Sequence, residues 1–324
     1  MDIKYRLKTA VLFLIFNRLD TAKPVFEVIK KAKPARLYIA SDGPRESKNG
    51  ETEIVHAVRE FVINNIDWDC EIKTLFRDKN LGCGRAVSSA ISWFFDNEEA
   101  GIILEDDIIP SQSFFLYCEE LLKKYKDEDK IWHIGGFNFD DSIAKGEGSY
   151  YFSKKAHVWG WATWRRAWKH YDFNMESFPY FKKNNDIERI FKYKDLQKYS
   201  MSNFEKCYKK KIDTWDYQWT YAMLSHGGAA VIPQKNMISN IGFGVDATHT
   251  KYGGSLFANA KRFEIIEIRH PEFISVNDKT DYDYFCKEYY GNTDVLKNPL
   301  KWFRNKIKKL LFKNIFTIKR FRQK

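Results

Sequence analysis

The chain has 324 residues, of which 44% are hydrophobic and 30% are charged, enough for a large buried core. Its longest apolar run, at residues 11–16, falls far short of the roughly 20 residues of a membrane-spanning helix. The five cysteines are odd in number and never spaced Cys-x-x-Cys, which argues against a disulfide framework and a structural zinc site. We therefore expect a reducing, cytoplasmic compartment. The net charge of +11 is typical of nucleic-acid-binding proteins, so its distribution along the chain matters.

The first 125 residues alternate short apolar runs with segments of helical periodicity, which is the pattern of βα units. The strands expected from these runs are 11–16, 36–41, 70–76 and 101–104. The helices expected beside them are 21–31, 51–65, 82–96 and 111–125, the last with Ser111 as its N-terminal cap. The pattern predicts a Rossmann-like α/β fold with a mixed, mainly parallel central sheet flanked by helices.

In open α/β sheets, ligands bind beyond the carboxyl ends of the strands, so the segments 17–18, 41–45, 77–84 and 105–107 are the candidates for a site. The last of these is the acidic triplet Glu105, Asp106 and Asp107. Three adjacent carboxylates repel one another unless a cation or strong donors hold them. Mg²⁺ and Mn²⁺ take one or two carboxylates and complete their shell with phosphate oxygens and water. The triplet therefore predicts a divalent cation with a nucleoside diphosphate, and a solvated acidic turn is the alternative.

Two other loops carry candidate donor-binding residues. The connection 77–85 has two glycines and ends at Arg85, where close backbone approach and a helix N-terminus would favour a diphosphate. The alternative, which remains open, is a loop in which the glycines only allow the turn and the basic residues are ordinary surface charges. Asp42, in an Asp-Gly-Pro sequence, either closes a turn or accepts a hydrogen bond from a base or ribose.

Six of the ten tryptophans lie between residues 150 and 252, and two of them, Trp159 and Trp161, form a Trp-Gly-Trp motif. Tryptophan faces stack on sugar rings and the indole N–H can bond to a hydroxyl, so we expect both to bind substrate. Core packing is the more frequent role of a single tryptophan. We assign Trp164 and Trp168, on an expected helix, to the core.

The segment 215–219 places one carboxylate, Asp216, among aromatic residues. Partial desolvation there would make Asp216 a stronger base, so it is the candidate general base, and Trp215 a candidate substrate contact. Helix capping is the alternative role of Asp216. The glycine-rich segment 241–250 contains His249, a candidate metal or diphosphate ligand, although a lone surface histidine is equally common.

Taken together, these motifs resemble a known family. The segments 16–18, 40–45, 80–82, 104–107, 159–164, 215–219 and 240–250 resemble bacterial nucleotide-diphospho-sugar glycosyltransferases of surface-polysaccharide clusters. That family is in turn similar to eukaryotic N-acetylglucosaminyltransferase I. The resemblance implies the GT-A fold, a UDP-sugar donor with UDP-N-acetylglucosamine as one candidate, Mn²⁺ or Mg²⁺, and inversion at the anomeric carbon.

The resemblance also implies a role for each matching residue. By position, Asp107 looks like the direct metal ligand. Asp216 looks like the catalytic base, although Tyr217 stands where the eukaryotic enzyme has a second acid. The residues implied at the donor are Arg18 at the nucleotide, Asp42 at uracil, and Glu105 and Asp106 at the donor sugar and ribose.

We therefore expect one glycosyltransferase domain over residues 1–296, with a nucleotide-sugar-binding half at 1–149 and an acceptor-binding half at 150–296. The expected partners are a nucleotide sugar and a saccharide or lipid-linked saccharide. A retaining transferase on the same fold, a glycoside hydrolase and a non-enzymatic sugar- or membrane-binding protein remain open.

The positive charge belongs to the end of the chain. Residues 297–324 contain 11 Lys and Arg and no acidic residue, while the remainder has 43 basic and 43 acidic residues. Apolar residues recur at helical spacing from 300 to 311, which predicts a basic amphipathic helix. Such a helix lies among the headgroups of an anionic membrane. We expect peripheral binding to the inner face of the cell membrane, and no nucleic acid, because the apolar face is large.

Overall fold

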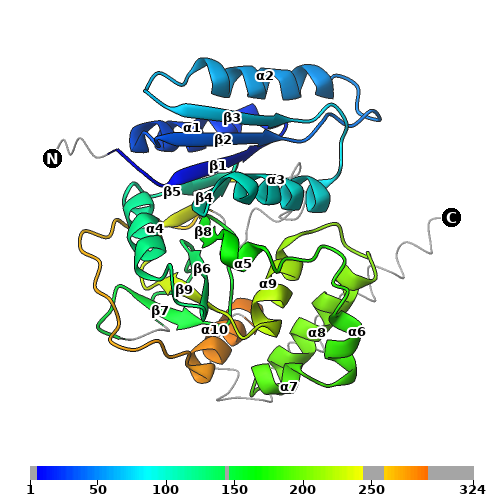
Figure 1. The fold of residues 1–324 in the computed structure, drawn as a ribbon, viewed down its shortest axis with the longest axis vertical. Helices are drawn as coiled ribbons and strands as arrows, with labels where there is room; N and C mark the ends of the chain where they lie inside the picture. The colour runs from blue at the N-terminus through cyan, green and yellow to red at the C-terminus, as the bar shows by residue number, and fades with distance from the viewer. Residues whose placement is uncertain (1–5, 143–145, 244–258, 291–324) are drawn as a thin grey trace, which may run out of the picture. The chain divides into compact units, whose positions relative to one another are not determined.

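The computed structural model describes residues 6–142, 146–243 and 259–290 (Figure 1). His249 and the basic tail at 297–324 lie outside the described residues. The chain divides into a compact unit that ends at Asp278 and a second unit that begins at Lys279. Of the second unit, the structure describes only the part that belongs to helix α10 (Asp278–Tyr290). Within the described ranges, no helix is both long enough and apolar enough to cross a membrane.

An eight-stranded sheet forms the framework of the first unit, together with a separate pair of strands. The strands are β1 (Ala10–Ile15), β2 (Arg36–Ser41), β3 (Glu71–Phe76), β4 (Ala100–Glu105), β5 (Ile108–Pro110), β6 (Ile131–Gly135), β7 (Tyr150–Ser153), β8 (Trp161–Trp164), β9 (Ala229–Pro233) and β10 (Ile238–Asn240). The large sheet has the order β3-β2-β1-β4-β8-β6-β9-β7, and β5 pairs with β10. The first four strands are parallel, β8 runs antiparallel to β4 and β6, and β7 runs antiparallel to β9. The predicted α/β class with a mixed, mainly parallel sheet is confirmed.

The helices of the first unit are α1 (Leu19–Ala32), α2 (Glu51–Asn64), α3 (Cys83–Asn97), α4 (Ser113–Lys124), α5 (Arg165–Trp168), α6 (Phe178–Lys183), α7 (Ile187–Ile190), α8 (Lys194–Tyr208) and α9 (Asp216–Ser225). All eight predicted strands and helices of the first 125 residues are present, each within two residues of its expected bounds.

Two local predictions are wrong. Ser111 does not cap α4, because the carboxylate of Glu264 accepts the backbone N–H groups of Gln112 and Ser113 at 2.9 and 2.7 Å. A carboxylate takes both donors of the helix end at once, which a serine hydroxyl cannot do. Trp164 is buried as expected, but it is the last residue of β8 and not part of a helix.

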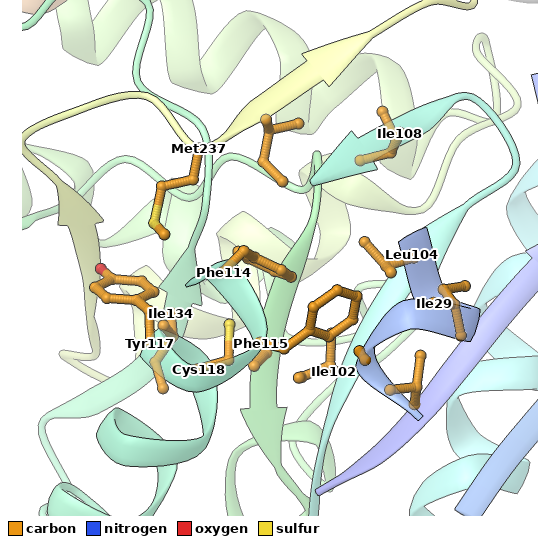
Figure 2. Close-up of a cluster of buried hydrophobic side chains, with 14 of the residues drawn as sticks. Ile29, Ile102, Leu104, Ile108, Phe114, Phe115, Tyr117, Cys118, Ile134 and Met237 are labelled. Carbon is orange, nitrogen blue, oxygen red and sulfur yellow. The ribbon is translucent and has the colours of Figure 1, made fainter. Parts of the chain in front are cut away.

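The side chains of each strand alternate between the two faces of the sheet. Ile102 and Leu104 of β4 point into the larger core, where they meet Phe114 and Phe115 of α4 (Figure 2). The helices that supply this core are α1, α2 and α4. Because of the alternation, Glu105 at the end of β4 belongs to the opposite face.

That opposite face is covered by α3, α5 and α9 (Figure 1). Trp168 of α5 donates a hydrogen bond to Ser92 of α3 at 3.1 Å, and Trp219 of α9 packs on Trp168 with ring centroids 5.2 Å apart. Leu14 of β1 and Glu105 of β4 are partners in register and line the same cavity beside α3. The sheet thus presents its acidic strand end beneath α3.

Candidate active site

A cavity of about 340 Å³ opens at the carboxyl ends of β1, β2 and β4, next to the start of α3. Its size is within the range of small-molecule sites. Four residues predicted at the donor line it together: Arg18, Asp42, Glu105 and Asp106. The cavity is also lined by polar residues to which the sequence analysis assigned no individual role: Asn17, Arg45, Arg77, Asn80, Cys83 and Asp213. We refer to this space as the donor cavity, after the role that the sequence predicted for these four residues.

Arg18 holds two carboxylates of the triplet. Its Nη2 lies 2.6 Å from Oδ1 of Asp106 and 2.7 Å from Oδ2 of Asp107. The backbone N–H of Phe16 donates to the other oxygen of Asp106 at 3.2 Å. Burial alone would lower the pKa of Arg18, but the charges of the two aspartates raise it overall. Asp106 is only 4% exposed, so the triplet is not a solvated turn.

The triplet carries more negative charge than Arg18 can balance. Burial raises the pKa of Glu105 to about 8, and the charges of Asp107 and Asp106 add to this effect. Burial also raises the pKa of Asp106 to about 6, against the opposing charge of Arg18. Within the described part of the chain, the Glu105 carboxyl accepts no hydrogen bond. A further cation beside these groups would offset the repulsion.

Asp42 ties two loops together. Its carboxylate accepts backbone N–H groups from Gly43 and Leu81 at 3.0 Å and from Gly82 at 3.2 Å. A Cβ at Gly43 would lie 2.4 Å from the backbone of Lys79, so only glycine allows the two loops this close. Burial raises the pKa of Asp42. Three donors leave about one acceptor position of this carboxylate for a ligand.

Asp213 occupies the start of α3, which the sequence suggested would be open to an anion. Its Oδ1 accepts the Gly84 N–H at 2.9 Å, and a Cβ at Gly82 would lie 2.8 Å from its Oδ2. Asp213 is 129 residues from Gly84 in sequence, and no motif marks it. Arg85, predicted at the donor, is not among the residues that line the donor cavity, and its guanidinium lies over Phe173, 4.7 Å from the ring centroid.

Asp216 is the first residue of α9 and accepts a hydrogen bond from the Thr214 hydroxyl. It is partly exposed. Burial raises the pKa of Cys83 to about 12, and nearby carboxylates, including those of Glu105 and Asp216, raise it further. The charge of Asp216 also contributes to the raised pKa of Glu105. Asp216 therefore lies near enough to the acidic strand end to influence its protonation.

The tryptophans divide into two groups. Trp161 is 0% exposed and stacks with His133 and with Trp215, with ring centroids 5.0 and 5.6 Å apart. Because Trp161 is fully buried and Trp215 is 3% exposed, neither ring offers a face to a sugar in this structure. That these two residues bind substrate therefore stays a prediction. Trp159 is partly exposed and packs edge-on against Phe137 at 4.7 Å.

Three residues that follow predicted strands have roles that only the structure reveals. Arg45 pairs with Glu51 of α2 and lowers its pKa, and Asn17 donates to the same carboxylate at 2.9 Å. These bonds join the ends of β1 and β2 at the rim of the donor cavity. Arg77 donates to Ser89 at 2.8 Å and forms no ion pair with a described residue. Arg77 is therefore a cation available to an anionic ligand.

The carboxylates of the triplet fit a divalent cation whose remaining ligands come from the substrate and from water. Among residues 6–142, 146–243 and 259–290, no group of three or more His, Cys, Asp or Glu side chains converges as a ready-made metal site. Mg²⁺ and Mn²⁺ often bind through only one or two carboxylates, with phosphate oxygens and water as the remaining ligands. The triplet can supply that number.

No family model and no curated protein matches this chain. Among solved structures, it is similar to the inositol-1-phosphate CTP transferase from T. maritima, with 12% identity, a TM-score of 0.39, and coverage of 71% of this chain and 86% of that one. S. aureus TarS 1-349 shows 11% identity and a TM-score of 0.40 over 71% of this chain and 59% of that one. HddC from Yersinia pseudotuberculosis shows 12% identity and a TM-score of 0.31 over 53% and 85%. Likenesses this distant decide neither the activity nor the substrate.

Proposed function

We propose that this chain is a metal-dependent glycosyltransferase with the GT-A fold, which moves a sugar from UDP or another nucleoside diphosphate to an acceptor hydroxyl. The acceptor is a saccharide or a lipid-linked saccharide. One observation carries the proposal: the donor cavity gathers Arg18, Asp42 and the acidic strand end of β4 at the edge where open α/β sheets bind ligands.

Different polar residues of the donor cavity bind different parts of the nucleotide sugar. Asp42, with about one acceptor position left, binds an N–H of the base or a ribose hydroxyl. Arg77, which has no ion pair among the described residues, offsets the charge of the diphosphate. Glu105 and Asp106 lie beside the donor sugar and ribose.

Asp107 is the residue that would hold Mn²⁺ or Mg²⁺, with Glu105 and Asp106 beside it. The excess of carboxylates over the single cation Arg18 supports this assignment. A bound divalent cation supplies Lewis-acid stabilisation of the leaving diphosphate. His249 remains a proposed ligand on sequence grounds alone.

Asp216 is the proposed general base. Its carboxylate takes the proton from the acceptor hydroxyl as the hydroxyl oxygen forms a bond to the anomeric carbon. The bond from that carbon to the diphosphate oxygen breaks in the same displacement, so the configuration inverts without a covalent enzyme intermediate. The anomeric configuration of the product, read by proton NMR, distinguishes this mechanism from a retaining one.

A panel of nucleotide sugars tests the proposal. Mn²⁺-dependent release of the nucleoside diphosphate, measured without acceptor, should single out one donor. Asp107→Asn should remove most of this turnover, with a loss on the order of several kcal/mol in transition-state stabilisation. Asp127→Asn is the matched control, because the Asp127 side chain is 86% exposed. Unchanged turnover in excess EDTA, or in Asp107→Asn, would contradict the metal assignment.

We also propose that residues 297–324 bind an anionic membrane surface, on the basis of their charge and apolar spacing. At roughly 1 kcal/mol per basic residue near the surface, half of the 11 would suffice to recruit the enzyme to a lipid-linked acceptor. Deleting these residues should abolish sedimentation with anionic liposomes and leave donor hydrolysis unchanged. Equal sedimentation of the truncated chain would refute the proposal.

A further inference from the structure

A second cavity, of about 240 Å³, adjoins the donor cavity. The two share Asp213, whose carboxylate stands between them. The second cavity is bounded by the start of α3, the end of α8 and the first turn of α9. Gln218, which lines it, follows Asp216 by two residues on α9. The second cavity therefore adjoins the segment 213–218, which contains the proposed base.

Two cations in the second cavity lack acidic partners. Within the described part of the chain, neither Arg85 nor Lys210 forms an ion pair or a side-chain hydrogen bond. Arg85 rests on the ring of Phe173, which fixes its position. Of the described residues that line this space, Asp213 is the one that is acidic, and its Oδ1 already accepts the Gly84 N–H at 2.9 Å. The second cavity therefore favours an anionic group.

Its other residues suit a sugar. Phe173 and Tyr208 provide aromatic surface for the C–H face of a pyranose ring. Gln218 is 2% exposed, and its Nε2 donates to the Thr214 carbonyl at 2.8 Å. Its Oε1 has no hydrogen-bond partner among the described residues. A buried acceptor without a partner is costly, and a ligand hydroxyl would satisfy it.

Building on the proposed function, we propose that the second cavity is the acceptor subsite and takes a saccharide unit that carries a phosphate or a carboxylate. Arg85 and Lys210 bind the acidic group, and the aromatic rings pack against the sugar. The Oε1 of Gln218 accepts a hydrogen bond from a sugar hydroxyl. The acceptor is thereby anchored at Gln218, two residues from Asp216 on the same helix. This assigns Arg85 to the acceptor, in place of the donor role expected from the sequence.

Binding of simple sugars to the full chain tests the inference. Isothermal titration with glucose 6-phosphate, glucuronate and glucose should show the two anionic sugars binding more tightly than glucose. Arg85→Gln and Lys210→Gln should each weaken at least one anionic sugar by about 10-fold, the loss expected for one charge-assisted contact. Lys211→Gln is the matched control, because it makes the same charge change at an exposed residue that does not line the second cavity.

Three results would overturn the inference: equal binding of glucose and the anionic sugars, equal weakening by Lys211→Gln, or inorganic phosphate binding as tightly as glucose 6-phosphate. The two anionic sugars distinguish a phosphorylated acceptor from a uronic acid. Metal-dependent hydrolysis of the nucleotide sugar, measured on the same wild-type preparation, tests the proposed function separately. If the chain hydrolyses the nucleotide sugar but does not bind the anionic sugars, only the acceptor subsite is refuted. If it binds the anionic sugars but does not hydrolyse the nucleotide sugar, the glycosyltransferase assignment is refuted.

Discussion

Gly242→Ala should displace the carboxylate proposed to hold the metal. A Cβ at Gly242 would lie 1.9 Å from Oδ2 of Asp107, the same oxygen that accepts from Arg18 at 2.7 Å. The backbone on both sides is held in place, because Asn240 accepts the Gly242 N–H at 2.8 Å and the Asp107 carbonyl accepts the Ile241 N–H at 2.9 Å. The added Cβ would also lie 2.8 Å from the Cβ of Asp107, so the carboxylate must move together with the backbone that carries it.

The size of the effect follows from this geometry. Real Cβ atoms essentially never approach a heavy atom closer than 3.0 Å, so Oδ2 must retreat by about 1 Å. A misplacement of about 1 Å in a catalytic group can cost a factor on the order of 10² in rate. We expect a loss of that order in Mn²⁺-dependent donor hydrolysis, together with weaker binding of Mn²⁺.

The assay compares Gly242→Ala with Gly146→Ala. Among the described residues, a Cβ at Gly146 would meet only the Gln234 side chain, at an ordinary 3.5 Å, so this control adds the same methyl group without a clash. Hydrolysis is measured by release of the nucleoside diphosphate, and Mn²⁺ affinity by electron paramagnetic resonance. If Gly242→Ala binds Mn²⁺ and turns over like the control, the position of Asp107 does not matter for the metal, and the reasoning fails.

Three further predictions concern other groups. Burial lowers the pKa of His133 to about 3, so the stability that its neutral form provides is complete above about pH 6.5 and is lost as the pH falls, by about 1.4 kcal/mol per unit. The free energy of unfolding, measured in urea at pH 7 and pH 5, should fall in the wild type and fall less in His133→Gln. An equal fall in the two proteins would contradict the assignment. Asp42→Ala should destabilise the chain by about 1–2 kcal/mol in urea unfolding, because three backbone donors lose their acceptor, whereas an unchanged midpoint would show that water replaces the carboxylate. Asp216→Asn should lower transfer to an acceptor by a factor on the order of 10² while donor affinity persists, and a loss of donor affinity in titration would move Asp216 into the donor site.

The sequence by itself determined the first four strands, their helices and the edge where the site lies. These elements depend on local periodicity, since alternating apolar runs such as 36–41 and helical spacing such as 51–65 are legible without distant contacts. The candidate loops followed from the same reasoning, because the carboxyl ends of parallel strands meet at one edge. Arg18, Asp42, Glu105 and Asp106 could therefore be expected to lie together.

Only the tertiary structure decided what depends on residues far apart in the chain. The burial of Trp161 follows from the insertion of β8 between β4 and β6, which brings its ring against those of His133 and Trp215. A buried tryptophan and a sugar-stacking one have the same local sequence, so no pattern separates them. Asp213 accepts the Gly84 N–H at the start of α3, although the two residues are 129 positions apart in the sequence. Asp213 also lines both the donor cavity and the second cavity, where Arg85 lies. Such contacts arise when the chain closes on itself, and the spacing of residues along the sequence does not encode them one by one.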